Sequence, residues 1–257
     1  MIRTIVMLCF WAAALPLCVL FFFPWTLLSG DIRLLYRACM WGASTGVRLA
    51  GVKVRILGRE RIDPARTYIY MSNHVSNLDP PLMLPLIPRR TSVMAKKELF
   101  GYPLLGRVMK IGSLVPVDRK NRDAGISAVR AAAEVIRRGI SMTIYVEGKR
   151  SWDGRLLPFK KGPFYLAEEC SVPVVPITIS GTHYIMPKGR FSIKPGEVTV
   201  TFHPPIEPRD FGNRDGLIEQ VRKSIDSALP EGQREYPSAE PTILPPGIDR
   251  REGTMPA

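Results

Sequence analysis

The N-terminal segment constrains the fold of this chain more than any other feature of its sequence. No charged residue occurs from Thr4 to Gly30, and about 20 consecutive apolar residues suffice for a helix to cross the hydrocarbon core of a bilayer. A cleaved signal peptide has a shorter apolar core, of about 7–15 residues, followed by a small-residue cleavage site. Neither property fits this segment. A pair of buried core helices is the soluble alternative, and we favour membrane attachment because so apolar a run is seldom stable in a small water-soluble domain.

Two prolines, Pro16 and Pro24, lie inside this apolar run. Each removes a backbone hydrogen-bond donor and favours a kink, so we expect a bent or re-entrant anchor rather than one straight span. The next stretch, Ile32 to Ala50, is apolar but is interrupted by three arginines. This pattern is typical of an amphipathic helix that lies against a membrane surface. Residues 1–50 are therefore expected to form a membrane-embedded helical pair.

The chain carries a formal net charge of +13. Such a balance fits nucleic acid, an anionic membrane surface or an anionic substrate as the partner, and a generally basic soluble surface is a fourth possibility. The sequence contains no recognition-helix motif, zinc-finger spacing or aromatic–basic RNA motif. We therefore expect membrane lipids and an anionic substrate as partners, and no nucleic acid.

The flanking charges and the cysteines bear on the location of the chain. Arg3 precedes the apolar run while Arg33 and Arg37 follow it, so the charges alone leave the orientation ambiguous. We expect a membrane protein whose soluble part lies on the cytoplasmic face. Four cysteines include no Cys-x-x-Cys pair, which argues against a zinc ribbon or a redox site. They are expected to be buried as small apolar side chains.

After residue 50 the sequence alternates between strand-like and helix-like segments. Six short apolar, partly β-branched segments predict strands: Thr67–Met71, Ser92–Ala95, Ser113–Val117, Met142–Val146, Val172–Ile179 and Glu197–Phe202. Three segments predict helices: Ala124–Arg138 with Gly139 as its stop, Pro163–Glu169 and Asp215–Leu229. Residues 51–230 are thus predicted to form one α/β domain, with a single mixed sheet flanked by helices. Residues 231–257 lack periodicity and are rich in Pro, Gly, Glu and Arg, which predicts a disordered tail.

A histidine and a carboxylate follow the first of these predicted strands. His74 and Asp79 stand five positions apart in the run Asn-His-Val-Ser-Asn-Leu-Asp. Imidazole has an unperturbed pKa of roughly 6.5. A strand that ends in His and turns into a helix carrying Asp can direct the carboxylate at one ring nitrogen, so that the other takes a proton from a hydroxyl. The spacing by itself is a weak signal, because most such pairs are accidental.

Other polar clusters also follow predicted strands. Residues 147–151 read Glu-Gly-Lys-Arg-Ser, where Gly148 permits a tight turn and Arg150 can bind a phosphate bidentately. A nucleotide-binding P-loop is excluded, since Thr143 stands where its first glycine is required. Another strand runs into Asp118 and Arg119. Ligands bind beyond the carboxyl ends of strands in open α/β sheets, so we expect these clusters to meet, although each alone is compatible with a solvated loop charge.

Five blocks in order across residues 50–205 resemble the 1-acylglycerol-3-phosphate acyltransferases of the phospholipid and glycerolipid acyltransferase family. They are residues 73–79, 96–100 (Lys-Lys-Glu-Leu-Phe) with 103–106 (Pro-Leu-Leu-Gly), 112–119 (Gly-Ser-Leu-Val-Pro-Val-Asp-Arg), 147–151 with 159–162 (Phe-Lys-Lys-Gly), and 172–177 (Val-Pro-Val-Val-Pro-Ile). The chain departs from the family at Val146, where many members have proline, and at Lys149, where many have threonine. Neither departure removes a catalytic group.

The resemblance implies transfer of an acyl group from a thioester to the sn-2 hydroxyl of a lysophosphatidic acid, with His74 as general base and Asp79 holding its tautomer. It implies that the glycerol phosphate is bound by Glu147, Gly148 and Arg150, with Lys96, Asp118 and Arg119 as second-rank candidates. No cofactor or metal is implied, and the co-substrate is acyl-CoA or an acyl carrier protein thioester. Ser76 is expected to support a turn, and His183 and His203 are expected to be structural, with His183 kept as a residue that could line the site.

Two alternatives remain open. A different acceptor, glycerol 3-phosphate or a lyso-aminolipid, would stay within the family, and the extra cation Lys149 is compatible with it. A membrane-bound protein that binds lipid phosphates without catalysis belongs to another class. Loss of His74 or Asp79 would favour that class, and both are present.

Overall fold

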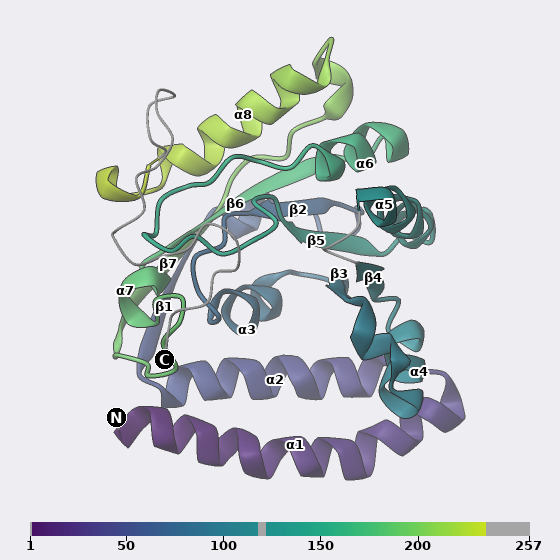
Figure 1. Ribbon diagram of the computed structural model, residues 1–257, viewed down its shortest axis with the longest axis vertical. Coiled ribbons are helices and arrows are strands. Elements are labelled where there is room, and N and C mark those ends of the chain that lie inside the picture. Colours follow the sequence, from purple (N-terminus) through teal and green to yellow (C-terminus); the bar gives the residue numbers. More distant parts are fainter. Residues whose placement is uncertain (1, 118–121, 235–257) are drawn as a thin grey trace.

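The structure, a computed structural model, describes residues 2–117 and 122–234 and contains one seven-stranded sheet with helices on both faces (Figure 1). The strands are β1 (Val52–Leu57), β2 (Ile69–Ser72), β3 (Thr91–Lys96), β4 (Val115–Val117), β5 (Ser141–Tyr145), β6 (Val174–Ser180) and β7 (Gly196–Phe202). Their order in the sheet is β1-β7-β6-β2-β5-β3-β4. All neighbours are parallel except β6 and β7. The predicted fold class, a mixed sheet flanked by helices, is confirmed.

Each of the six predicted strands overlaps one in the structure, and β1 is the strand that sequence reasoning missed. Residues 52–57 read Val-Lys-Val-Arg-Ile-Leu and pair in parallel with β7 at the edge of the sheet. Exposed charged residues alternate with apolar ones along this edge, a pattern that protects an edge strand from pairing with other chains. The same charges hide the apolar signal on which the strand predictions rested.

Eight α-helices lie in the described residues: α1 (Ile2–Ser29), α2 (Arg33–Leu49), α3 (Asp79–Met83), α4 (Pro103–Ile111), α5 (Arg122–Arg137), α6 (Gly162–Cys170), α7 (Thr182–Ile185) and α8 (Arg214–Ser227). Short 3₁₀ helices occur at Arg59–Arg61, Leu84–Leu86, Lys97–Gly101, Pro208–Asp210 and Glu231–Gln233. The three predicted helices correspond to α5, α6 and α8. Gly139 follows α5 with a φ of 74°, a conformation that glycine adopts readily, so it ends the helix as predicted.

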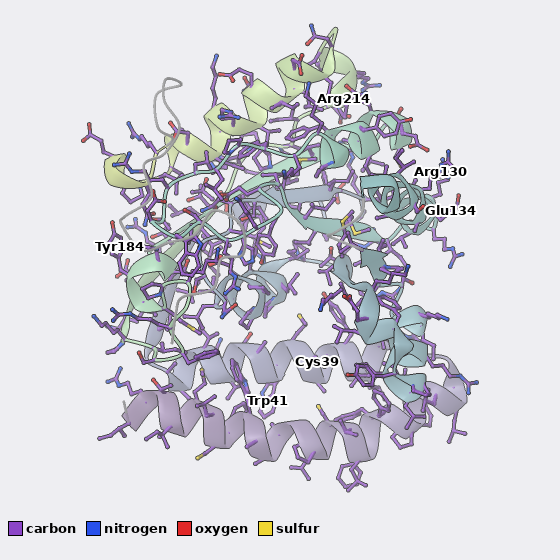
Figure 2. The ribbon with its side chains drawn as sticks, viewed as in Figure 1. Cys39, Trp41, Arg130, Glu134, Tyr184 and Arg214 are labelled. Carbon is purple, nitrogen blue, oxygen red and sulfur yellow. The ribbon has the colours of Figure 1, made fainter. Side chains whose placement is uncertain are left out.

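Two apolar cores lie on opposite faces of the sheet. One core joins the sheet to α5, α6 and α8, and the other joins it to α2 and α3. Helix α1 packs outside α2, so the molecule has an extra helical layer on that face (Figure 1). Arg130 and Glu134 of α5 and Arg214 of α8 belong to the opposite layer, whereas Cys39 and Trp41 lie on α2 beside α1 (Figure 2).

Helix α1 is continuous through Pro16 and Pro24. The prediction of a bent or re-entrant anchor stays a prediction, because a helix can bend at a proline and remain continuous. The length and composition of α1 are sufficient for a helix that crosses a membrane, and only 6% of its most apolar 18-residue stretch is buried in the protein. That exposure contradicts the alternative of a buried core helix.

The amino-terminal turns of α1 are nevertheless attached to the α/β domain. Met7 is buried in the core beside α2. The Thr4 hydroxyl donates to the carbonyl of Ile193 at 3.3 Å and accepts from the Ile193 N–H at 3.0 Å. The loop that follows α7 is therefore connected to the apolar helix.

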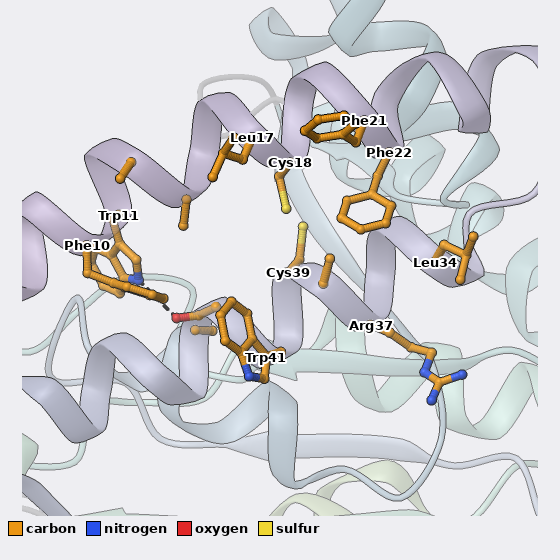
Figure 3. A pocket seen from close by; sticks show the side chains of 15 residues that line it. Phe10, Trp11, Leu17, Cys18, Phe21, Phe22, Leu34, Arg37, Cys39 and Trp41 are labelled. Atoms are coloured by element: carbon orange, nitrogen blue, oxygen red, sulfur yellow. Dashed lines mark hydrogen bonds between the residues drawn. The ribbon is translucent and has the colours of Figure 1, made fainter.

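An apolar cavity of about 860 Å³ lies between α1 and α2 (Figure 3). All 15 residues that line it belong to these two helices, and Arg37 is the one charged residue among them. The four cysteines are free, and Cys9 and Cys39 are exposed. The prediction that the thiols are buried is therefore wrong for these two, because the helical pair presents much of its apolar surface outward.

The beginning of the predicted tail packs against the domain. Gln233 is buried, and its carbonyl accepts a hydrogen bond of 3.1 Å from the N–H of Leu156. The rest of the tail, residues 235–257, lies outside the described residues.

Candidate active site

Three neighbouring strands bring the candidate residues together. Strands β6, β2 and β5 are adjacent and parallel at the centre of the sheet, so their carboxyl ends lie at one edge, where ligands bind in open α/β sheets. The segment after β2 carries His74 and Asp79, the segment after β5 carries residues 147–151, and the segment after β6 begins with α7. The predicted convergence at this edge follows from the sheet order.

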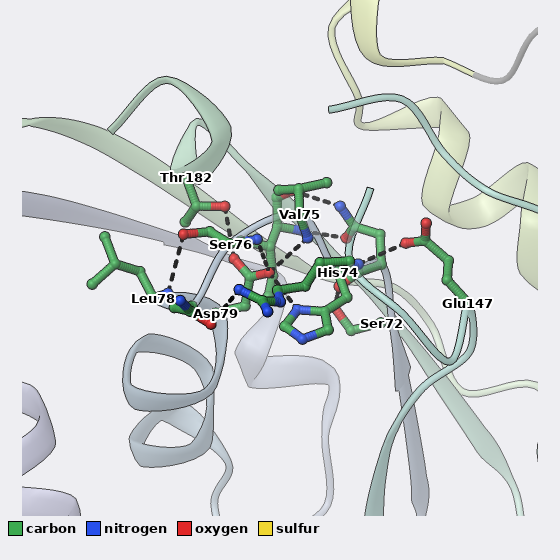
Figure 4. Close-up of polar contacts among 12 residues, drawn as sticks. Ser72, His74, Val75, Ser76, Leu78, Asp79, Glu147 and Thr182 are labelled. Atoms are coloured by element: carbon green, nitrogen blue, oxygen red, sulfur yellow. Dashed lines mark hydrogen bonds and ion pairs between the residues drawn. The ribbon is translucent and has the colours of Figure 1, made fainter. Parts of the chain in front are cut away.

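The His74 ring and the Asp79 carboxylate form a direct contact (Figure 4). His74 Nδ1 lies 2.7 Å from Asp79 Oδ2. Asp79 is the first residue of α3, so the turn between β2 and α3 brings its carboxylate back to the imidazole. A neutral imidazole that donates from Nδ1 to this carboxylate presents Nε2 as an acceptor. This is the arrangement that a general base requires.

Three further hydrogen bonds hold Asp79. Its Oδ2 accepts the backbone N–H groups of Val75 and Ser76, each at 2.8 Å. Its Oδ1 accepts the hydroxyl of Thr182 at 2.7 Å. The side chain of Asp79 is fully buried, and a buried carboxylate is stable only with such partners. The orientation of the imidazole therefore depends on α7 as well as on the local turn.

The imidazole also stacks on Tyr145, the last residue of β5. The ring centroids are 4.0 Å apart and the planes are inclined by 20°. The Tyr145 hydroxyl is buried and has no hydrogen-bond partner among the described residues. Burial raises its pKa well above the ordinary value, with the nearby Asp79 charge acting in the same direction. Tyr145 thus acts on the ring of His74 as a neutral aromatic surface.

Glu147 holds the backbone of the His74 segment. Its Oε1 accepts the N–H of His74 at 2.6 Å, and its Oε2 accepts the N–H of Leu157 at 2.9 Å. The residue is 1% exposed. Burial raises the pKa of this carboxyl to about 8. The hydrogen bonds from the two backbone N–H groups lower the pKa, and the charges of Asp79 and Asp153 raise it.

The predicted contact of Glu147 with the glycerol phosphate stays a prediction. Both oxygens already accept backbone N–H groups in this structure. The geometry makes Glu147 a positioning residue for His74.

The turn after Glu147 brings Arg150 to the His74 segment. Arg150 Nη1 donates to the side-chain oxygen of Asn77 at 2.5 Å, and the N–H of Ser151 donates to the carbonyl of His74 at 3.0 Å. Gly148 permits this turn, since its φ is 70°. The N–H of Val146 donates to the carbonyl of Ser72. A proline at position 146 could not make that bond, so the departure from the family pattern adds a connection between β2 and the loop after β5.

Lys96 is the second-rank candidate that the described residues include. Lys96 ends β3, which is separated from β2 by β5. Its ammonium pairs with Glu98 at 3.3 Å, and both side chains are about 60% exposed. Asp118 and Arg119 lie outside the described residues.

The remaining predicted roles can be compared with the structure. Ser76 is buried and its hydroxyl donates to the carbonyl of Met186 at 2.7 Å, which supports the expected turn role. His203 is buried and contacts the Thr178 hydroxyl at 2.9 Å through Nε2, as expected of a structural residue. His183 Nδ1 is buried and has no hydrogen-bond partner in the part of the chain that the structure describes. Within residues 2–117 and 122–234, no group of three or more His, Cys, Asp and Glu could hold a metal ion.

Sequence reasoning missed Thr182, Tyr145 and Asn73. The amide of Asn73 exchanges hydrogen bonds of 2.9 and 2.8 Å with the backbone of Ile179, which fixes the segment after β2 against β6. The position of Asn73 beside His74 was a usable signal for this role. Thr182 and Tyr145 gave none, because their contacts depend on which strands are neighbours.

Comparison with known proteins identifies the family of this chain. The acyltransferase family model matches residues 53–180. A 1-acyl-sn-glycerol-3-phosphate acyltransferase of Limnanthes alba is 34% identical over 226 residues, which cover 87% of this chain and 79% of that protein. One from Cocos nucifera is 36% identical over 169 residues, 65% of this chain and 55% of that protein.

A solved structure has the same fold. The crystal structure of the 1-acyl-sn-glycerophosphate (LPA) acyltransferase PlsC from Thermotoga maritima matches with a TM-score of 0.72 and 27% identity, covering 87% of this chain and 93% of that chain. Fold, ordered motifs and sequence identity agree over most of the chain. The chain therefore belongs to the acyltransferase family that includes the 1-acyl-sn-glycerol-3-phosphate acyltransferases.

Proposed function

We propose that this protein transfers a fatty acyl group from a thioester to the sn-2 hydroxyl of 1-acylglycerol 3-phosphate and so makes phosphatidic acid. The observation that carries the proposal is the 2.7 Å contact between His74 Nδ1 and a fully buried Asp79. The names of the similar proteins support this acceptor.

In this mechanism His74 is the general base. Its Nε2 takes the proton of the sn-2 hydroxyl while the hydroxyl oxygen attacks the thioester carbonyl. The tetrahedral intermediate collapses with cleavage of the carbon–sulfur bond, and the imidazolium returns the proton to the leaving thiolate. Asp79 stabilises the imidazolium between these steps. General-base help is worth about 10²–10⁴-fold, so substrate positioning and oxyanion stabilisation must supply the rest.

Arg150 is proposed to bind the phosphate of the acceptor. Its guanidinium is held beside the His74 segment through Asn77, and guanidinium groups bind phosphate with paired hydrogen bonds. Gly148 supports this role because its turn sets the position of Arg150. Lys96, Asp118 and Arg119 remain proposals of second rank.

The donor and the location also belong to the proposal. We propose acyl-CoA or an acyl carrier protein thioester as donor, and a membrane location with the α/β domain on the cytoplasmic face. The exposed apolar surface of α1 supports the membrane location. In such a position the acyl chains of the donor and the acceptor stay in the hydrocarbon of the bilayer, while the head group of the acceptor reaches His74.

The test is thiol release by the detergent-solubilised protein supplied with 1-acylglycerol 3-phosphate and acyl-CoA. We expect release that requires the acceptor, disappears in His74→Ala and persists in His183→Ala, which changes a histidine outside the hydrogen-bonded cluster. Release with an acyl carrier protein thioester alone would identify that donor. Release only with glycerol 3-phosphate or a lyso-aminolipid would replace the acceptor. No release with any of these would contradict the proposal and favour a binding protein.

A further inference from the structure

Lys188 lies beside the phosphate-binding candidate Arg150, although no motif of the sequence draws attention to it. Its Nζ donates to the backbone carbonyl of Arg150 at 3.1 Å. The same ammonium stands 4.1 Å from the centroid of the Trp152 ring. Both contacts fix a flexible side chain at the turn that carries Arg150.

The chain segment that carries Lys188 is anchored to the His74 turn. Lys188 follows α7, whose first residue, Thr182, donates to Asp79. Two residues before Lys188, the carbonyl of Met186 accepts the hydroxyl of Ser76 at 2.7 Å. The backbone that leads to Lys188 is therefore tied to the His74 turn by two connections that do not involve Arg150.

Positive charge accumulates at this point without a negative partner in these contacts. Arg150 donates to a neutral amide, and Lys188 donates to a carbonyl and faces an aromatic ring. Burial lowers the pKa of Lys188, and the charges of Arg150 and Lys149 lower it further. A dianionic phosphate monoester would relieve this repulsion and accept charge-assisted hydrogen bonds from both side chains.

An ammonium has three N–H donors, and the contact with Arg150 uses one of them. We propose that Lys188 binds the phosphate of the acceptor together with Arg150 and thereby makes the enzyme prefer acceptors that carry a phosphate monoester. This inference rests on the proposed function. It adds to it a specificity-determining residue outside the five sequence blocks.

The first experiment compares Lys188→Gln, Lys188→Arg and Lys194→Gln. Lys194 is an exposed lysine of the same loop, so its substitution is the matched control for loss of one charge. A charge-assisted hydrogen bond lost in Lys188→Gln should raise the KM for 1-acylglycerol 3-phosphate by about tenfold or more. In Lys188→Gln, the kcat and the KM for the acyl donor should stay close to those of the wild type. Lys188→Arg should retain most of the affinity for 1-acylglycerol 3-phosphate. Lys194→Gln should leave the KM for 1-acylglycerol 3-phosphate unchanged.

The second arm uses 1-acylglycerol, which lacks the phosphate. In Lys188→Gln, the ratio of kcat/KM for 1-acylglycerol 3-phosphate to kcat/KM for 1-acylglycerol should fall. The factor should be about that by which the KM for 1-acylglycerol 3-phosphate rises. An unchanged ratio would overturn the proposal. An equal loss of kcat/KM on both acceptors gives such an unchanged ratio. It would indicate a structural role of the Trp152 contact, which would lower both values alike.

A binding measurement separates this inference from the proposed function. In the His74→Ala background, calorimetric titration with 1-acylglycerol 3-phosphate in detergent should show weaker binding with Lys188→Gln than with Lys194→Gln. The outcome does not depend on turnover. Absence of acyl transfer by the wild type would count against the proposed function alone, whereas equal binding by these two double variants would refute the role of Lys188.

Discussion

Asp79 Oδ2 contacts Nδ1 of His74 and also accepts the backbone N–H groups of Val75 and Ser76, the two residues that follow His74. One oxygen atom therefore fixes the imidazole and the turn that carries it. Rotation of the ring away from Asp79 would leave a buried carboxylate short of a hydrogen bond, which is costly. The catalytic geometry and the fold of this turn are thus stabilised by the same group.

Asp79→Asn should lower kcat strongly. The amide cannot stabilise an imidazolium, and its NH₂ group would face a donor if it replaced Oδ2. We expect a loss of about 10²–10⁴-fold in kcat, measured by thiol release with saturating acceptor and donor. Circular dichroism should show that the variant is folded. A kcat within threefold of the wild type would contradict the role assigned to this pair.

Thr182→Val should weaken catalysis from a distance. The valine is close in shape but leaves Asp79 Oδ1 without the hydroxyl that it accepts at 2.7 Å. We expect about 1–3 kcal/mol of lost stability and a fall in kcat, with the KM of the acceptor little changed. Thr182→Ser keeps the hydroxyl and is the control. Equal kcat values in the two variants would show that α7 does not position Asp79.

Tyr145→Phe should be tolerated, whereas Tyr145→Leu should not. The Tyr145 hydroxyl is buried without a partner, so its removal should leave the unfolding free energy unchanged or raise it by up to about 1–3 kcal/mol. Leucine removes the ring that stacks on His74, an interaction worth about 0.5–1.5 kcal/mol between aromatic rings. Unfolding curves and kcat measured on both variants distinguish the hydroxyl from the ring. Loss of activity in Tyr145→Phe would instead assign the hydroxyl a role in the reaction.

Glu147→Gln should change how stability depends on pH. Burial raises the pKa of Glu147 to about 8 in the folded protein, from an ordinary value of 4.5. Between these values the folded state holds a proton that the unfolded state has released, so the unfolding free energy of the wild type falls as pH rises through this window. The stability of the variant relative to wild type should therefore increase from pH 5 to pH 8.5 in urea titrations. A difference that does not vary with pH would contradict the raised pKa.

His203 should contribute to acid lability. Burial lowers its pKa from 6.5 to about 4, with the charge of Arg61 acting in the same direction. The unfolded state takes up a proton first as pH falls, so the stabilisation present above pH 6.5 is lost as pH falls through the folded pKa near 4. His203→Gln should lose less stability than the wild type between pH 7 and pH 4. Parallel pH curves for the two proteins would exclude this contribution.

Local sequence patterns predicted much of the sheet and the central pair of the site. His74 and Asp79 are five positions apart, and a strand followed by a short turn and a helix is enough to bring their side chains together. The six predicted strands were recognisable because their sequences are apolar and partly β-branched. Strand β1 was not, because an edge strand tolerates the charges that break its pattern.

The sequence alone thus indicated the class of fold, the histidine and carboxylate proposed as the base and its partner, and the apolar character of the first helix. Tertiary structure decided what surrounds that pair. Thr182 reaches Asp79 across 103 positions of sequence, and Lys188 reaches Arg150 across 38. These contacts exist because β6 and β5 flank β2, and the order of strands in a sheet is set by the packing of helices on its two faces rather than by any local spacing of residues.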